Sequence, residues 1–105
     1  MGKEKVKAIR IFLQNIRKTF KPEKILLFGS RARGDALEDS DFDLVVVSEK
    51  FKGMSEYERM VSVYSLKREP VSVDVICITP AEFQERSHEL SIIGEAAKEG
   101  IEITA

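Results

Sequence analysis

Two short groups of small, hydroxyl and carboxyl residues suggest the chemistry of this chain. Gly29 and Ser30 follow the apolar segment Lys24–Phe28. Ten residues lie between Ser30 and Asp41, and Asp41 and Asp43 open a second apolar segment. A Gly-Ser turn lets the backbone approach a phosphate closely and supplies a hydroxyl donor. On a strand, Asp41 and Asp43 would share one face with Cα atoms about 6.6 Å apart, where they repel unless a cation such as Mg²⁺ lies between them. The pattern therefore indicates phosphoryl or nucleotidyl transfer.

The same residues also occur in ordinary turns and solvated acidic loops. At average composition, however, this spacing arises by chance in only about 0.1% of chains of this length, so a functional site is the favoured interpretation. A P-loop is excluded, although Gly29 and Gly34 have its glycine spacing. Asp35 and Ala36 stand where a P-loop needs Lys and Ser or Thr, and an acidic residue there would repel the phosphates.

Asp74 is the candidate third carboxylate. It interrupts the otherwise apolar run over residues 71–78, and an ionised Asp is seldom buried in a strand without a partner. Alone, Asp74 would more often pair with an Arg or cap a loop. Together with Asp41 and Asp43 it is better explained as part of one site, since intruding carboxylates in apolar runs mark functional positions. The strands that carry Asp43 and Asp74 must then be neighbours in the sheet.

The elements that position these residues follow from apolar periodicity and from helix caps. An amphipathic helix is predicted over about 3–19, ended by Pro22, with six residues on its apolar face: Val6, Ile9, Phe12, Leu13, Ile16 and Phe20. Strands are predicted over 24–28, 42–48 and 71–78, with a short helix bearing Arg31 and Arg33 after the first of them.

Three further helices are predicted in the second half of the chain. Ser55 and Glu58 form a capping box that opens a helix to about residue 67, with Tyr57, Val61 and Tyr64 facing inward. Thr79, Pro80 and Glu82 begin another helix, and a last one over about 91–99 ends at Gly100 before a short edge strand at 101–104. Helices alternating with strands around one small mixed sheet predict an α/β (α+β) sandwich.

Length and composition fit one globular domain spanning residues 1–105. The chain has a net charge of −1 and 43% apolar residues, with no apolar run long enough for a membrane span and no signal peptide, so the cytoplasm is the expected compartment. Cys77 lies within an apolar run and is expected in the core, whereas His88, the sole histidine, is expected at the surface.

Basic residues gather on the outer face of the N-terminal helix. Such a charge run is more often a solvated face, but it could also steer a nucleic acid or an acidic partner. The residues concerned are Lys3, Lys5, Lys7, Arg10, Arg17, Lys18 and Lys21.

The segments Gly29–Gly34 and Ser40–Leu44, followed by Asp74, resemble the nucleotidyltransferase superfamily named after DNA polymerase beta. Within it the chain is similar to the minimal nucleotidyltransferases, short proteins often paired with a helical HEPN-domain protein as antitoxin and toxin. The resemblance is close over about residues 22–80. It implies the polymerase beta-like fold and two Mg²⁺ ions, or Mn²⁺, with Asp41, Asp43 and Asp74 as ligands.

The resemblance also implies ATP as co-substrate, transfer of its AMP to a hydroxyl of a partner protein or RNA, and an antitoxin role. Gly29, Ser30, Arg31 and Arg33 would then bind the nucleotide, and Asp74 would take the acceptor proton. A solvated position on the helix explains either Arg equally well. Two alternatives remain: an antitoxin that acts by binding alone, and a transferase that modifies small molecules such as antibiotics, an activity typical of longer chains with an added helical domain. The acceptor, the preferred nucleotide and the oligomeric state are left open.

Overall fold

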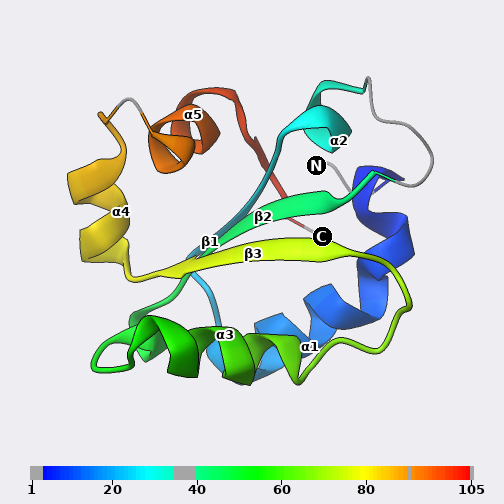
Figure 1. Ribbon diagram of the computed structural model, residues 1–105, viewed down its shortest axis with the longest axis horizontal. Coiled ribbons are helices and arrows are strands. Elements are labelled where there is room, and N and C mark those ends of the chain that lie inside the picture. Colours follow the sequence, from blue (N-terminus) through cyan, green and yellow to red (C-terminus); the bar gives the residue numbers. More distant parts are fainter. Residues whose placement is uncertain (1–3, 35–39, 90, 105) are drawn as a thin grey trace.

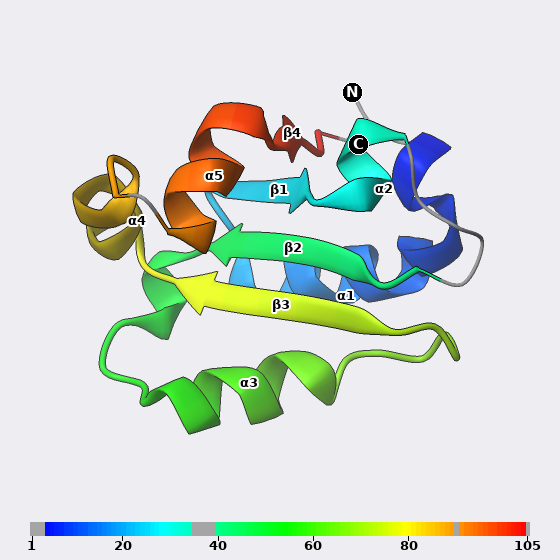
Figure 2. The same ribbon diagram turned by 45° about the horizontal axis from the view of Figure 1, so that its top comes forward.

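The computed structural model describes residues 4–34, 40–89 and 91–104, and a four-stranded mixed sheet lies at its centre. The strand order is β3-β2-β1-β4, formed by Val73–Ile78, Phe42–Val47, Lys24–Phe28 and Ile101–Glu102 (Figure 2). β1 is antiparallel to β2 and β4, whereas β2 and β3 are parallel. The predicted class, a small mixed sheet flanked by helices, is confirmed.

Helices cover both sides of this sheet (Figure 1). The helices α1 (Arg10–Phe20) and α3 (Glu56–Tyr64) lie on one side, and α4 (Pro80–Arg86) and α5 (Ile92–Glu99) lie on the other. Side chains alternate between the two faces, so the central strands must be apolar on both. One core contains Leu27, Leu44 and Val46 with the α1 side chains, and the other contains Leu26, Val45 and Val47 with Ile93 and Ala96.

The predicted N-terminal helix is in fact not continuous, and its first part is itself kinked at Val6 (φ −117°, ψ 17°). The 3₁₀ helix η1 (Glu4–Ile9) precedes α1, and the junction at Ile9 has the non-helical angles φ −121° and ψ 28°; residue 3, the predicted start, lies outside the described residues. All six predicted apolar-face residues are nevertheless buried. The break exposes the first N–H groups of α1, which a distant carboxylate caps: Glu69 accepts from Ile11 N at 2.7 Å and from Phe12 N at 3.1 Å. An acidic group there also complements the helix dipole.

Replacing Glu69 with alanine should lower the free energy of unfolding by about 1–2 kcal/mol, because α1 would lose its N-terminal cap. Glu69→Gln keeps an acceptor but removes the charge, so its loss should be smaller. Urea unfolding of the three proteins measures both effects. Equal midpoints for all three would show that the bonds to Ile11 and Phe12 do not contribute to stability.

The helix α3 has the predicted capping box but a different inner face. Ser55 accepts from Glu58 N at 3.1 Å, and Glu58 accepts from Ser55 N at 2.7 Å. The prediction that Tyr57 and Val61 face inward was wrong: Tyr57 is 71% and Val61 47% exposed. Instead Arg59 and Val63 are buried, Tyr64 is half-buried, and the helix ends at Tyr64 rather than near residue 67.

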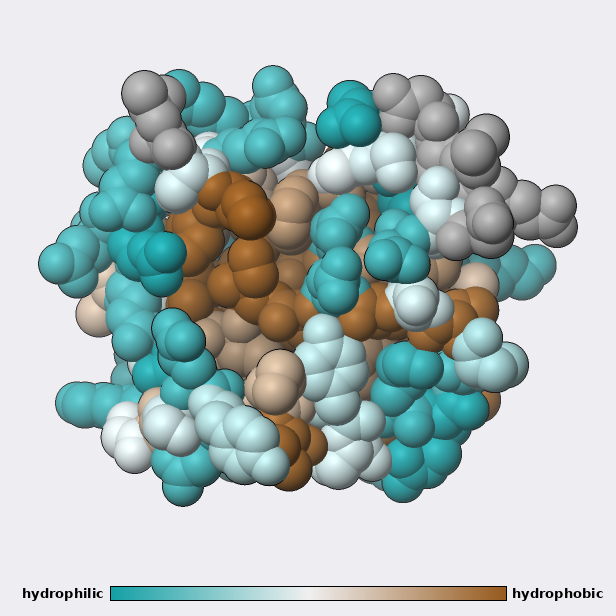
Figure 3. All heavy atoms as spheres, in the orientation of Figure 1, coloured by the Kyte–Doolittle hydropathy of each residue, from teal (hydrophilic) through white to brown (hydrophobic). Residues whose placement is uncertain are grey.

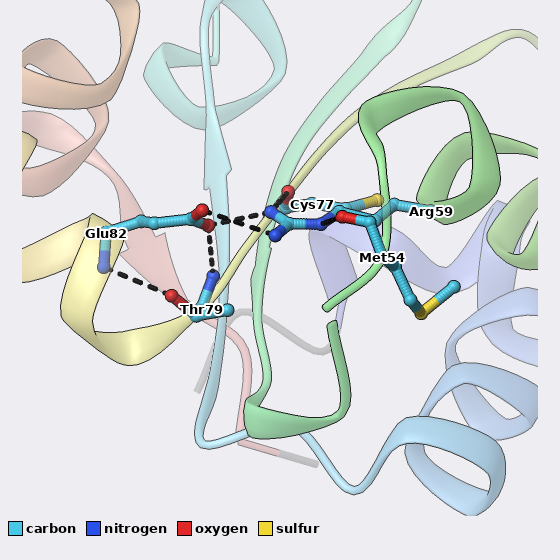
Figure 4. Close-up of polar contacts among 5 residues, drawn as sticks. All are labelled: Met54, Arg59, Cys77, Thr79 and Glu82. Carbon is cyan, nitrogen blue, oxygen red and sulfur yellow. Dashed lines mark hydrogen bonds and ion pairs between the residues drawn. The ribbon is translucent and has the colours of Figure 1, made fainter. Parts of the chain in front are cut away.

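A polar network of the buried Arg59 accounts for this rotation of α3 (Figure 4). The guanidinium donates to Met54 O at 3.0 Å, to Cys77 O at 3.1 Å and to both carboxylate oxygens of Glu82, at 2.7 and 3.2 Å. Glu82 also closes the predicted capping box of α4 with Thr79. A buried charge needs such partners, so the position of Arg59 decides which side of α3 faces the sheet.

Stability should depend on the ionisation of Glu82. The hydrogen bond from Arg59 is the main cause that holds the pKa of Glu82 below its ordinary value of 4.5 in the folded chain. The ionised carboxylate therefore stabilises the fold above that value, and the contribution is lost as the pH falls through the lowered folded pKa. Glu82→Gln should be less stable than the parent at pH 7, and urea unfolding at several pH values should show the difference shrinking in acid. A difference independent of pH would contradict this origin.

The last elements agree with the sequence. The helix α5 ends at Gly100, whose N–H donates to Ala96 O at 2.8 Å, although Gly100 is extended rather than left-handed. The predicted edge strand is β4, and after it Ile103 N still donates to Ile25 O at 2.8 Å. Among the described residues, no helix has both the length and the apolar content that a membrane crossing requires.

The strand β3 lies at the outer edge of the sheet, and α3 contacts it there. Phe42 N donates to Ser72 O, and Ser48 N donates to Ile78 O. The backbone groups of every second residue between Ser72 and Ile78 therefore face β2, and those of the residues between them face outward. Two of the intervening groups are bonded to α3: Val75 N donates to Tyr64 Oη at 2.8 Å, and Cys77 O accepts from Arg59. The middle of β3 is half-buried and apolar. Figure 3, in the orientation of Figure 1, shows a band of hydrophobic residues across the middle of the molecule.

Candidate active site

Sheet register brings the Gly-Ser turn and two of the predicted carboxylates together. Phe28, which precedes Gly29, lies opposite Asp43 in the β1–β2 pair, and Asp43 lies opposite Asp74 in the β2–β3 pair. The prediction that the two acidic strands are neighbours is confirmed. The glycine, Asp43 and Asp74 therefore form a row across three adjacent strands, at the end where β2 and β3 begin and where α2 (Ser30–Arg33) lies (Figure 1).

The contact between Gly29 and Asp43 requires a glycine. Gly29 has φ +73° and ψ −158°, a conformation that residues with a Cβ rarely adopt. A Cβ built there would also lie 2.5 Å from Asp43 Oδ2. The carboxylate thus rests directly against the backbone of the turn. Ser30, the first residue of α2, is half-buried beside it.

Electrostatic repulsion acts on the three carboxylates. Asp43 is half-buried, Asp74 is exposed, and Asp41 is exposed and lies immediately before β2 rather than within it. Burial raises the pKa of Asp43 above its ordinary value of 3.8, and the charges of Asp74 and Asp41 raise it further. A divalent cation would relieve this repulsion, and carboxylate oxygens are the ligands that Mg²⁺ prefers. The donor set therefore fits a magnesium ion.

The carboxylates are gathered by the backbone but do not form a closed ligand set. Within residues 4–34, 40–89 and 91–104, no three His, Cys, Asp or Glu side chains are grouped as metal ligands. Like charges separate when no cation holds them. Because Mg²⁺ is usually bound by one or two carboxylates plus substrate phosphates, a preformed cage is not required. Metal binding by Asp41, Asp43 and Asp74 remains a prediction.

The two predicted nucleotide-binding arginines have different surroundings. Arg31 is half-buried and donates to Ser40 O from Nε at 3.1 Å and from Nη2 at 2.7 Å, with its guanidinium 4.3 Å from the centre of the Phe42 ring. It therefore fastens α2 to the segment that enters β2. Arg33, in contrast, is exposed. Phosphate binding by either side chain remains a prediction, and of the two Arg33 is the more accessible.

Sequence reasoning missed two groups near the row. Nothing in the spacing showed that Arg31 would hold Ser40, or that Tyr64 would bond the backbone N–H of Val75, next to Asp74. Burial raises the pKa of Tyr64, the bond from Val75 N–H lowers it, and the charge of Asp74 raises it. The only available signal was the inward position of Tyr64 on its helix.

Two other reactive residue types lie outside the site. Cys77 is half-buried, and burial raises the pKa of its thiol to about 12, so the thiol is neutral at pH 7 and is a poor nucleophile. His88 is exposed, as predicted.

A family model described as "Nucleotidyltransferase domain" matches residues 9–103, which include the whole row. The chain belongs to the nucleotidyltransferase domain family. This nucleotidyltransferase is 29% identical over 105 residues to "Putative protein adenylyltransferase MJ0141" of Methanocaldococcus jannaschii, covering 95% of this chain and 99% of that one. The predicted family and enzyme class are confirmed.

Solved structures share the fold of this nucleotidyltransferase. One is a crystal structure titled as a "putative nucleotidyltransferase" from Sulfolobus solfataricus, with TM-score 0.66, 26% identity, and 93% of this chain and 80% of that one covered. Another is titled "Crystal structure of the toxin-antitoxin with AMP-PNP", with TM-score 0.54, 18% identity, and coverage of 89% and 69%. At that identity the second likeness concerns the fold alone.

Proposed function

We propose that this nucleotidyltransferase, acting as one domain over residues 1–105, transfers AMP from ATP to a hydroxyl group of a partner protein. The observation that supports the proposal best is the row of Gly29, Asp43 and Asp74 across three strands. It puts a turn suited to phosphates directly against carboxylates suited to a divalent ion. An RNA hydroxyl is the alternative acceptor.

Each residue of the row has a chemical role in this proposal. Asp41, Asp43 and Asp74 would hold two Mg²⁺ ions, or Mn²⁺, which when bound supply charge neutralisation for the triphosphate. Gly29 allows the phosphates close to the backbone, Ser30 donates a hydrogen bond, and Arg33 adds positive charge.

The proposed reaction is an in-line displacement. The acceptor oxygen forms a bond to the α-phosphorus, the bond from the α-phosphorus to the oxygen bridging to the β-phosphate breaks, and pyrophosphate leaves. Asp74 lies on the outermost strand of the sheet and is exposed, so an acceptor on a second molecule can reach it. Its carboxylate takes the hydroxyl proton.

A protein acceptor is favoured over RNA by the name of the relative MJ0141, a protein adenylyltransferase. The toxin–antitoxin structure of the same fold, which holds AMP-PNP, supports a paired system. By the resemblance to the minimal nucleotidyltransferases, the acceptor in our proposal is a toxin with a helical HEPN-type domain, and this chain is its antitoxin.

Labelled nucleotides test the reaction class. With Mg²⁺ and the partner present, ATP labelled at the α-phosphate should label the partner, and ATP labelled at the γ-phosphate should not. We expect this because the transferred AMP carries the α-phosphate, whereas the γ-phosphate leaves as part of pyrophosphate. Label from the γ-position alone would identify a kinase instead. Adduct on RNA but not on protein would select the alternative acceptor.

A further inference from the structure

A groove of about 580 Å³ lies between the N-terminal helices and the segment after β4. Its apolar wall includes Val6 of η1, Leu13 of α1 and Ile103, all three of which are buried. A space of this size can receive several side chains of another molecule. It belongs to the opposite edge of the sheet from β3, because Ile103 follows the edge strand β4.

Positive charge lines this groove. Lys7, Arg10 and Arg17 contribute to its lining, against the single carboxylate of Glu4. Arg17 donates from Nη2 to Ile103 O at 2.7 Å, while its buried Nε has no hydrogen-bond partner among the described residues. A buried donor without an acceptor is unfavourable, so a small movement of this guanidinium toward an incoming carboxylate would be stabilising.

We propose that the groove is a docking site for a polypeptide segment of a partner protein in which an apolar side chain is flanked by Asp or Glu. The apolar side chain would rest on the small exposed parts of Val6, Leu13 and Ile103 and on the aliphatic stems of Arg10 and Arg17, and the carboxylates would pair with the guanidinium groups of these two arginines. Opposite charges at the rim and an apolar centre are the arrangement of specific protein interfaces.

A polypeptide fits this groove better than a nucleic acid does. Sites for single-stranded nucleic acids combine positive charge with aromatic side chains on which bases stack, and no aromatic residue is among the described residues that line the groove. Glu4 would also repel a phosphate backbone. The net charge of −1 for the whole chain adds no general attraction for nucleic acid.

The groove and the row of site residues are connected through η1. Lys5 Nζ lies 3.8 Å from the position that a Cβ on Gly34 would occupy, so the Lys5 side chain of η1 lies near the end of α2, the helix that begins at Ser30. The helix η1 thus contributes to the lining of the groove and also lies near the end of α2. The docking inference does not depend on transfer chemistry, because binding alone tests it.

Selection from a random library of displayed dodecapeptides, without nucleotide or metal, tests the proposal. The enriched peptides should share an apolar residue next to Asp or Glu. A synthetic copy of the best peptide should shift the methyl signals of Val6, Leu13 and Ile103 in nuclear magnetic resonance spectra. Arg10→Glu should weaken its binding on the order of tenfold, because the charge at the rim is reversed.

Lys18→Glu is the matched control, since Lys18 is an exposed cation of the same helix that does not line the groove. Its binding should stay within about twofold of the parent. Three results would overturn the proposal: no enriched peptide, enriched peptides without acidic residues, or equal weakening by Arg10→Glu and Lys18→Glu. Tighter binding of a dodecathymidine strand than of the best peptide would assign the groove to nucleic acid.

Discussion

Asp43→Asn should abolish nucleotidyl transfer and leave the chain folded. Asp43 is at the centre of the row, in contact with Gly29 and opposite Asp74, so its charge is required wherever a divalent ion is held. We expect transfer of α-label to fall by a factor of about 10³ or more, and binding of Mg-ATP in calorimetry to be lost. Without metal, the variant should be at least as stable as the parent, because one of three repelling carboxylates has been removed.

Glu49→Gln is the matched control for Asp43→Asn. Glu49 is an exposed carboxylate just beyond the other end of β2, so its loss should change neither transfer nor Mg-ATP binding. If Asp43→Asn binds Mg-ATP as tightly as the parent, the site assignment is wrong. If a chain with both Asp41→Asn and Asp43→Asn still neutralises the proposed toxin partner fully, the protein acts by binding and not by transfer.

Gly29→Ala should be nearly as damaging to activity as the loss of Asp43. The new methyl group would lie 2.5 Å from Asp43 Oδ2, so either the carboxylate or the turn must move. A displacement of about 1 Å at a reacting centre can cost on the order of 10²-fold in rate. The backbone conformation of Gly29, with φ +73° and ψ −158°, adds a loss of stability on the order of 1–3 kcal/mol when a Cβ is present. Transfer of α-label and urea unfolding measure the two effects separately.

The variant Gly53→Ala separates the effect of backbone strain from the effect of a clash with Asp43. Gly53 also has a positive φ, of +83°, but a Cβ there meets nothing within 4 Å. Both alanine variants should therefore lose stability from backbone strain, and only Gly29→Ala should lose activity. Equal activity of both variants would show that the close approach of Gly29 to Asp43 is not needed for the reaction.

The sequence predicted the row because each part of it has a local signature. Gly29 is conspicuous because a turn follows an apolar strand, and Asp74 because a charge stands in an apolar run. We predicted neighbouring strands because Asp43 and Asp74 would have to share a cation. The parallel register of β2 and β3 confirms that the two strands are neighbours. The helix caps were also predictable, since Ser55 and Thr79 each form hydrogen bonds with the residue three positions later in the chain.

The errors concern interactions between residues far apart in the chain. The break before α1 is capped by Glu69, 57 and 58 positions from the N–H groups it accepts. The inner face of α3 is decided by Arg59, whose partner Glu82 lies 23 positions away. Periodicity assigns apolar side chains to the core and cannot anticipate a buried charge whose partner comes from another helix.

The two bonds from α3 to the outer side of β3 also affect the solubility of the chain. An exposed apolar edge strand is a template on which a strand of another molecule can pair, which leads to amyloid-like aggregation. Tyr64 and Arg59 occupy a donor and an acceptor that such a strand would need, at Val75 and Cys77. The same helix that covers one core thus protects the nucleotidyltransferase from growth of its sheet through β3.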